Sequence, residues 1–304
     1  IGRTPSAKIL LKAFADVKPT VILSVPLILE KIYKKMIQPQ ISKNPVSWVL
    51  KVPLLDQVVL GKIREKLMTA FGGEFSQIII GGAPLNAEVE AFLRRIKFPI
   101  TIGYGMTETA PLISFTPWTE FRSQSCGQVL RGFMEARISN PDADGVGEIQ
   151  VRGENVMMGY YKNEQATKES LTEDGWLRTG DLGTIDEDGF IYIKGRCKTM
   201  LLGPSGQNIY PEEIEAKINN MPYVLESLVL QKEDARLVAL VCPDFEAVDA
   251  DKLTQEQLEV AMEENRKLVN QQLAAYEQVN VFKLYPHEFE KTPKKSIKRF
   301  LYEA

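Results

Sequence analysis

The chain has 304 residues, of which 44% are hydrophobic and 25% charged, and its formal net charge is −3. These values are ordinary for a folded protein of two or three domains, and they give no reason to expect a nucleic-acid partner or a membrane-embedded chain. The single histidine, His287, makes a Ser-His-Asp triad or a histidine-rich metal site hard to build. The three cysteines, Cys126, Cys197 and Cys242, are too far apart for a metal-binding motif and suit a reducing compartment.

The first part of the sequence alternates short apolar runs with segments of helical spacing. Helices are predicted at 8–15, 27–37, 57–70 and 86–97, and buried strands at 20–25, 78–80 and 98–102. Strand–helix–strand alternation at this spacing predicts a parallel sheet covered by helices. Ligands of such sheets bind at the carboxyl ends of the strands, so the glycine motifs at 81–83 and 103–105 should lie at the same edge.

From about residue 125 the pattern changes to short alternating segments with Gly and Asp turns, which predicts a compact antiparallel sheet or barrel. Beyond it, a helix at 211–219, two strands, a long helix at 254–275 and a last strand predict a small α+β domain. The expected fold class is therefore α/β plus α+β. We expect a partial parallel α/β sheet at 1–115, a β-barrel-like subdomain at 116–195 and a small mobile C-terminal domain at 196–304.

The stretch GYGMTET at 103–109 combines residue types that suit a nucleotide. Two glycines flank Tyr104, whose ring offers a face for a base. The hydroxyl of Thr107 can hydrogen-bond a phosphate, and the carboxylate of Glu108 can hold Mg²⁺ through oxygen. On the pattern alone, a polar turn after a buried strand is the favoured interpretation, and the other motifs of the chain change that balance.

Three further segments carry candidate polar groups. The double glycine at 81–82 allows close approach to a flat ligand, or serves helix packing. Asp181 can grip a ribose diol or form an Asx turn, and Arg196 can pair with phosphate or ribose or make a structural ion pair. Five basic residues crowd the tail and predict either a solvated face or a nucleic-acid patch. They are Lys291, Lys294, Lys295, Lys298 and Arg299.

The order and spacing of these motifs resemble those of the adenylate-forming superfamily, and within it the sequence is most similar to bacterial long-chain fatty acid–CoA ligases. The resemblance covers essentially the whole chain. It is carried by the series GGAPL, GYGMTET, DGWLRTGD, IKGR, GQNIYPEEIE and TPKKSIKR.

The resemblance implies a two-step reaction. A carboxylate attacks the α-phosphate of Mg·ATP, which releases pyrophosphate and leaves an acyl-adenylate, and the thiol of coenzyme A then displaces AMP. Such chemistry depends on positioning and charge neutralisation more than on a protein nucleophile. The implied cofactors are ATP or AMP, Mg²⁺ and coenzyme A, with a fatty acid as substrate. The implied location is the cytoplasm, or the periphery of the inner face of the membrane.

The resemblance also implies roles for individual residues around the nucleotide. Gly81, Gly82 and Ala83 would border the adenine, and Tyr104, next to Gly105, would pack on it. Thr107 would contact the α-phosphate, and Glu108 would hold Mg²⁺. Asp181 would accept from both ribose hydroxyls, and Arg196 would reach the same sugar or the phosphate. Lys198 would be the hinge between a large and a small domain, with Gly206, Gln207 and Asn208 facing coenzyme A.

Two departures from the family pattern stand out. The family's phosphate loop, rich in Gly, Ser and Thr and ending in Pro-Lys-Gly, is absent from the sequence. Because the sequence begins at Ile1, we expect a piece of a longer protein that does not form an adenylate by itself. The family's tail lysine is replaced by Ser296, and Lys294, Lys295 or Lys298 could substitute for it, with Lys295 preferred.

Two other functions remain open at this point. A ligase of the same superfamily could pass the acyl group to a carrier-protein phosphopantetheine instead of coenzyme A. Alternatively, the chain could be a noncatalytic binding or membrane-docking module that uses its basic tail. Neither the acyl chain length nor the oligomeric state can be inferred from the sequence.

Overall fold

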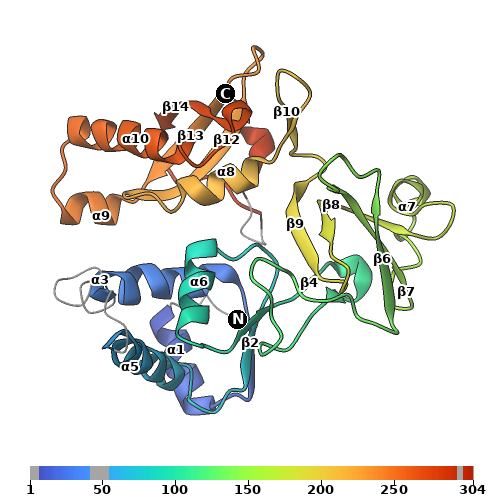
Figure 1. Ribbon diagram of the computed structural model, residues 1–304, viewed down its shortest axis with the longest axis horizontal. Helices are drawn as coiled ribbons and strands as arrows, with labels where there is room; N and C mark the ends of the chain where they lie inside the picture. Colours follow the sequence, from blue (N-terminus) through green and yellow to red (C-terminus); the bar gives the residue numbers. More distant parts are fainter. Residues whose placement is uncertain (1–6, 42–54, 293–296, 304) are drawn as a thin grey trace. The chain divides into compact units, whose positions relative to one another are not determined.

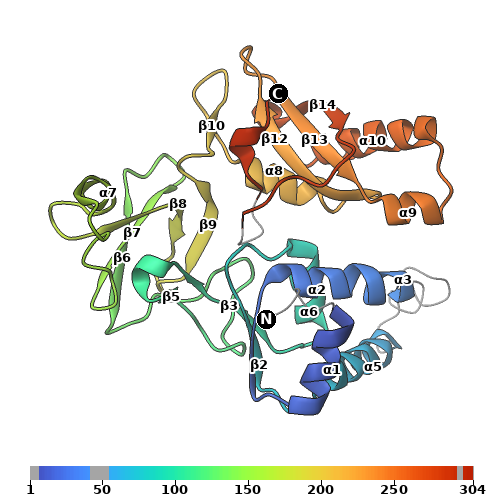
Figure 2. The ribbon, with the colours of Figure 1, turned by 180° about the vertical axis from the view of Figure 1, so that it is seen from behind.

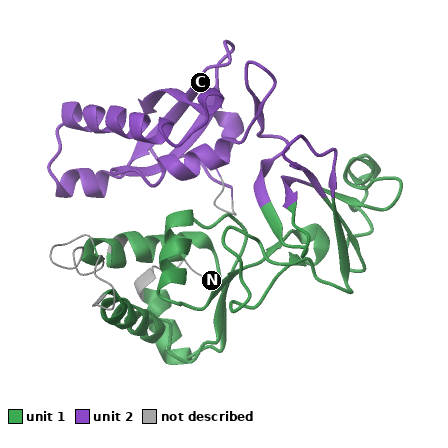
Figure 3. Cartoon of the chain, viewed as in Figure 1, with its two compact units in different colours: residues 1–137, 150–179, 185–192 green, residues 138–149, 180–184, 193–304 purple. Residues whose placement is uncertain are grey.

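The computed structural model describes residues 7–41, 55–292 and 297–303 (Figures 1 and 2). The chain divides into two compact units (Figure 3). Unit 1 comprises residues 1–137, 150–179 and 185–192, and unit 2 comprises residues 138–149, 180–184 and 193–304. In the described part of the chain, no helix is long and apolar enough to cross a membrane.

Unit 1 contains a three-stranded parallel sheet of order β1-β2-β3, which confirms the predicted α/β sheet. Its strands pair in register, with Ile22 opposite Ile78 and Ile78 opposite Ile100. The elements in chain order are α1 Ala7–Val17, β1 Val21–Ser24, α2 Pro26–Ile32, the π-helical turn Tyr33–Ile37, α3 Gln38–Ile41, α5 Leu55–Ala70, β2 Gln77–Ile80, α6 Ala87–Arg95 and β3 Ile100–Ile102.

Apolar residues of the strands and helices form the core of unit 1. Ile78, Ile80 and Ile100 bury their side chains in one cluster with Phe71 and Phe98. The aromatic members contact one another, with 5.8 Å between the ring centroids of Phe71 and Phe98. Burying each such side chain contributes about 1.5–3 kcal/mol, which is why the short strands hold together.

The start of α6 is specified locally, as the sequence predicts. Asn86 is the N-cap, and its side-chain oxygen accepts from the backbone N–H of Glu88 at 2.9 Å and of Val89 at 3.2 Å. Such a cap typically contributes about 1 kcal/mol to helix stability. It fixes where the chain turns from the Gly81–Gly82 segment into the helix.

The second part of unit 1 begins with β4 Tyr104–Gly105, the 3₁₀ turn Thr107–Thr109 and β5 Leu112–Ser114. Beyond these, a four-stranded sheet has the order β6-β7-β8-β9, and the residues of its strands are divided between unit 1 and unit 2. Its elements are β6 Met134–Ser139, β7 Gly147–Gly153, α7 Glu164–Ser170, β8 Leu177–Ile185 and β9 Ile191–Arg196. The sheet is open, so of the two predicted alternatives the structure has the sheet and, among the described residues, no closed barrel. The predicted Asp-Gly turns are present, and Gly145 and Gly189 have φ of +77° and +86°.

Unit 2 contains the predicted α+β arrangement, with a sheet of order β12-β13-β14. Strands β12 and β13 are antiparallel, and β13 and β14 are parallel. The elements are β10 Leu201–Leu202, β11 Asn208–Ile209, α8 Pro211–Ile218, β12 Val224–Gln231, β13 Leu237–Pro243, α9 Phe245–Ala250, α10 Gln255–Asn270, the 3₁₀ turn Ala275–Glu277, β14 Val279–Leu284 and the 3₁₀ turn Arg299–Leu301.

Helix α10 starts where predicted but ends earlier than the predicted residue 275. Thr254 forms a capping box, because its hydroxyl accepts from Gln257 N–H while the Gln257 side chain accepts from Thr254 N–H at 2.8 Å. At the other end, Asn270 is the last residue of the helix, and its side chain hydrogen-bonds the first residue of β14. Its side chain donates to the carbonyl of Val279 and accepts from the N–H of Val279, both at 2.9 Å.

The described basic residues of the tail, Lys291, Lys298 and Arg299, each pair with an acid of unit 2. Lys291 pairs with Glu226 at 2.7 Å and forms an isolated antiparallel bridge with Ile297. Tyr302 packs edge-on against Phe289, with the ring centroids 5.1 Å apart. Lys294, Lys295 and Ser296 lie outside the described residues.

The tail also covers a buried acid on α8. Glu215 is 9% exposed, and one of its oxygens accepts from Val229 N–H at 2.7 Å and from the Arg299 guanidinium at 2.6 Å. Arg299 donates its other amino group to the carbonyl of Val229 at 2.6 Å. Burial raises the pKa of Glu215 to about 7, although Arg299 and the backbone hydrogen bond act in the opposite direction.

We therefore expect Glu215 to make folding pH-dependent. Because its folded-state pKa is above its usual value of 4.5, the folded chain binds this proton more tightly, and stability decreases as the pH rises from about 4.5 to 7. In the wild type, this proton should make the free energy of unfolding fall by up to about 3 kcal/mol across this range, and Glu215→Gln should abolish that fall. Urea unfolding at several pH values measures it. Glu264→Gln, at an exposed position of α10, is the control, and parallel pH profiles for wild type and Glu215→Gln would contradict the expectation.

Candidate nucleotide site

The two glycine motifs of unit 1 lie side by side at the carboxyl ends of β2 and β3, as predicted. Gly103 N–H donates to the carbonyl of Ile80 at 2.9 Å, and Gly81 N–H donates to the carbonyl of Ser24 at 3.1 Å. A Cβ atom at position 81 would lie 3.3 Å from the carbonyl oxygen of Gly103, which leaves little room for a side chain. Gly82, at φ +86°, and Ala83 are exposed. This edge therefore offers backbone that a flat ligand can approach closely.

The β4–β5 hairpin follows directly and explains the glycine at 105. A Cβ atom there would lie 1.8 Å from the carbonyl oxygen of Pro111, so no other residue fits. Tyr104 pairs with Ser114 across the hairpin, and its side chain is only 7% exposed. The packing of the Tyr104 ring on adenine stays a prediction. Because the side chain is almost buried, only a small part of the ring could contact the base.

Three polar residues of the turn after β4 have different surroundings. Thr107 is exposed, Glu108 is half-buried and Thr109 is fully buried. The Thr109 hydroxyl lies 3.0 Å from the carbonyl of Met106 and 2.9 Å from that of Pro111, which makes it part of the turn itself. Of these three residues, Thr107 and Glu108 are thus the ones that a ligand can reach.

Sequence reasoning missed the segment that holds this turn, which consists of residues 155–160. The amide of Asn155 donates to the carbonyls of Thr109 and Leu112, at 2.6 and 2.9 Å. Met157 N–H donates to the carbonyl of Glu108 at 2.8 Å, and the Tyr160 hydroxyl donates to Glu108 Oε1 at 2.8 Å. The only signal in the sequence is a glycine-bounded run, GENVMMGY, whose long-range contacts no local pattern reveals.

The contact fixes the Glu108 carboxylate. The hydrogen bond to Glu108, with a smaller effect of burial, raises the pKa of Tyr160, so the phenol keeps the proton that it donates. A group of three or more His, Cys, Asp or Glu side chains that could enclose a metal is absent from the described residues. Mg²⁺ commonly binds one or two carboxylates together with phosphate oxygens and water, so the single oriented carboxylate of Glu108 is compatible with this coordination.

Within unit 2, the structure brings Asp181 and Arg196 together. Arg196 Nε lies 2.9 Å from Asp181 Oδ1, and the arginine side chain is 67% exposed whereas the aspartate side chain is 8% exposed. The structural ion pair that the sequence left open therefore exists. The exposed guanidinium can still reach a sugar or phosphate next to the buried carboxylate.

The predicted hinge residue Lys198 is exposed and lies between two partly buried neighbours. Cys197 and Met200 pack against a cluster formed by Val146, Leu182 and Tyr210. Burial, followed by the charges of Glu148 and Asp181, raises the pKa of the Cys197 thiol, which makes it a poor nucleophile. The hinge role stays a prediction.

The segment predicted to face coenzyme A forms the turn between β10 and β11. Gly206 has φ of +82°, and the backbone carbonyl of Gln207 accepts from Gly203 N–H at 2.8 Å. Asn208 donates its side-chain amide to Asp142 Oδ2 at 3.0 Å. The structure thus describes the fold of this segment, and its proximity to a cofactor remains a prediction.

Comparisons with known proteins agree with this description. Residues 2–161 match the AMP-binding enzyme family. The chain is 30% identical, over 98% of its own length and 55% of the relative's, to the long-chain-fatty-acid–CoA ligase FadD15 of Mycobacterium bovis. It is 31% identical, over 76% of its length and 33% of the relative's, to the long-chain-fatty-acid–CoA ligase ACSBG2 of Gallus gallus. The chain thus spans about half the length, or less, of these curated relatives.

Solved structures show the same fold. The ATP-bound RpMatB-BxBclM chimera B1 superposes with a TM-score of 0.72 at 25% identity, covering 98% of this chain and 53% of the other. The o-succinylbenzoate CoA synthetase MenE of Bacillus subtilis, in complex with the intermediate OSB-AMP, superposes with a TM-score of 0.72 at 24% identity, covering 100% and 55%. With a match over more than half of its residues, the chain belongs to the AMP-binding enzyme family.

Proposed function

We propose that this chain is part of an ATP-dependent long-chain fatty acid–CoA ligase and carries residues for binding the nucleotide of the adenylation step. The observation that carries the proposal is the Thr107–Glu108 turn. It follows the carboxyl end of a parallel strand, next to a glycine edge, and its acid is oriented by Tyr160. The relatives FadD15 and ACSBG2 suggest the substrate class, because both are named long-chain-fatty-acid–CoA ligases.

In this proposal the residues of unit 1 contact the base and the phosphates. The backbone at Gly81–Ala83 borders the adenine, and the exposed hydroxyl of Thr107 donates to the α-phosphate. Glu108 holds Mg²⁺, which when bound neutralises phosphate charge as the carboxylate substrate approaches. The protein thereby stabilises developing charge with groups that are already in place, which is the main requirement of this chemistry.

Residues of unit 2 have separate proposed roles. Asp181 accepts from the two ribose hydroxyls, since one carboxylate has enough lone pairs for both, while Arg196 pairs with the sugar or a phosphate. The turn at Gly206–Asn208 contacts coenzyme A, and Lys295 of the tail assists adenylation. Coenzyme A is the proposed acceptor because the curated relatives are named as CoA ligases.

Asp181 provides a direct test of nucleotide binding. Asp181→Asn should weaken AMP binding about 10- to 100-fold, because a charge-assisted contact to the ribose contributes about 1.5–3 kcal/mol. Isothermal titration of the whole chain with AMP measures the change. Asp234→Asn is the matched control, since Asp234 also pairs with an arginine, Arg236, of unit 2. Equal AMP affinity in both variants and wild type would contradict the proposed role, provided that thermal melts show that all three fold.

Tyr160 tests the magnesium assignment through binding rather than catalysis. Tyr160→Phe removes the hydroxyl that orients Glu108, and partners of this kind typically contribute about 10-fold or more to metal affinity. We expect the Mg²⁺-dependent gain in ATP affinity to decrease about 10-fold, with AMP binding in the absence of Mg²⁺ unchanged. Tyr161→Phe, at the neighbouring and 88% exposed position, is the control. A Mg²⁺ dependence that Tyr160→Phe leaves intact would contradict the assignment.

A further inference from the structure

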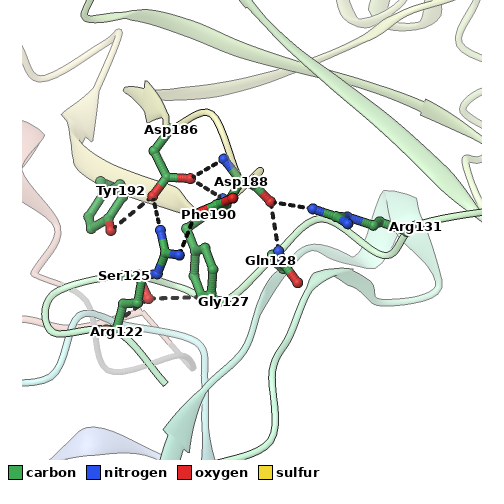
Figure 4. Close-up of polar contacts among 9 residues, drawn as sticks. All are labelled: Arg122, Ser125, Gly127, Gln128, Arg131, Asp186, Asp188, Phe190 and Tyr192. Carbon is green, nitrogen blue, oxygen red and sulfur yellow. Dashed lines mark hydrogen bonds and ion pairs between the residues drawn. The ribbon is translucent and has the colours of Figure 1, made fainter. Parts of the chain in front are cut away.

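Arg122 forms a polar clamp with the turn between β8 and β9, all within unit 1 (Figure 4). Its guanidinium donates to Asp186 Oδ2 at 2.7 Å and to the carboxylate of Asp188. The same guanidinium lies over the ring of Phe190, 4.0 Å from the centroid. Two carboxylates and a ring therefore fix the position of one side chain, unlike a single surface ion pair.

The turn that Arg122 holds is ordered by its own hydrogen bonds. Asp186 Oδ1 accepts from the N–H groups of Asp188 and Phe190, at 3.1 and 2.9 Å. The Tyr192 hydroxyl lies 3.3 Å from Asp186 Oδ2 (Figure 4). Although desolvation opposes it, hydrogen bonds from Phe190 and Arg122 keep the pKa of Asp186 below its usual value. The clamp thus joins Arg122 to a preformed, ionised turn.

The two residues after Arg122 are held from a second direction by α6. Glu90 of this helix is 1% exposed, and its carboxylate accepts from the Ser123 hydroxyl at 2.7 Å. It also accepts from the N–H and the side-chain amide of Gln124, at 3.1 and 2.8 Å. A buried carboxylate whose hydrogen bonds are satisfied in this way keeps its partners in one arrangement. Residues 122–124 are therefore fixed on both sides.

The chain that continues from the clamp lies between β5 and the β8–β9 hairpin. Gly127 sits in it at φ +83°, where a Cβ atom would come within 2.7 Å of Phe115 Cα. Backbone hydrogen bonds join this segment, residues 126–130, to both neighbours. They run from Cys126 N to Ile191 O (2.8 Å), from Val129 N to Gly189 O (3.0 Å), from Phe115 N to Gln128 O (2.8 Å) and from Leu130 N to Ile113 O (3.1 Å).

These contacts lead directly to the nucleotide turn. Ser114 of β5 bridges Val129 on one side and pairs with Tyr104 of β4 on the other. We propose that Arg122 and Glu90 are positioning residues, which fix β5 and through it the Tyr104–Glu108 segment in the geometry that binds the nucleotide. That this geometry binds a nucleotide rests on the function proposed above, whereas the claim that Arg122 and Glu90 hold β5 and residues 104–108 in place does not.

Arg122→Met tests the inference, because it keeps an apolar stem over Phe190 and removes both ion pairs. Amide hydrogen exchange of the whole chain should accelerate about tenfold at Phe115, Val129 and Leu130, as expected for the loss of two ion pairs and a cation–π contact. The effect should extend to Met157, whose N–H binds the carbonyl of Glu108. AMP affinity should decrease about fivefold at the same time.

Arg131→Met is the matched control, since Arg131 makes a single hydrogen bond to the carbonyl of Asp188 and should leave Met157 unaffected. Arg122→Lys should restore part of the protection, because an ammonium cannot reproduce the fork that bridges two carboxylates. Faster exchange confined to residues 121–131, with Met157 unchanged, would overturn the positioning role. If wild type fails to bind AMP, the proposed function is wrong while the exchange data still decide this role.

Discussion

The parallel pairing of β2 with β3 is the constraint on which the glycine edge of the proposed nucleotide site depends. It places the carboxyl ends of both strands together, so that the Gly81 backbone comes next to the carbonyl of Gly103. Parallel strands need a crossover connection, and α6 provides it. The same helix carries Glu90, whose buried carboxylate holds Ser123 and Gln124. One βαβ unit therefore sets both the glycine edge and an anchor for residues 122–124.

Much of this fold can be read from the sequence because it is encoded locally. The apolar run before Gly81 and the amphipathic segment after Asn86 specify a strand, a cap and a helix through neighbouring residues alone. Glycines in the sequence also mark positions of tight backbone packing, as at Gly105, where there is no space for a side chain. The early end of α10 was missed because Asn270 bonds to Val279, nine residues away, and competition of this kind has no periodic signature.

The supporting residues of the site could not be predicted for the same reason. Tyr160 reaches Glu108 across 52 positions, and Arg122 reaches Asp188 across 66. Neither pair alters the hydrophobic pattern of its own segment, and both depend on where separate strands end in space. The family resemblance named Glu108 but was silent on its partner, because motifs record the residues that contact ligands more readily than those that hold them.

Burial distinguishes Glu90 and Glu215 from Glu108. Glu90 and Glu215 are almost fully buried, and their oxygens accept hydrogen bonds from backbone and side chains of the protein. Glu108 is half-buried, with Oε1 bound to Tyr160 and its carbonyl bound to Met157, so its position is fixed while the carboxylate stays accessible. An acid that is oriented yet reachable loses little entropy when it binds a cation. This combination of order and access, more than the acidic side chain itself, is what supports the proposed role of Glu108 as a magnesium ligand.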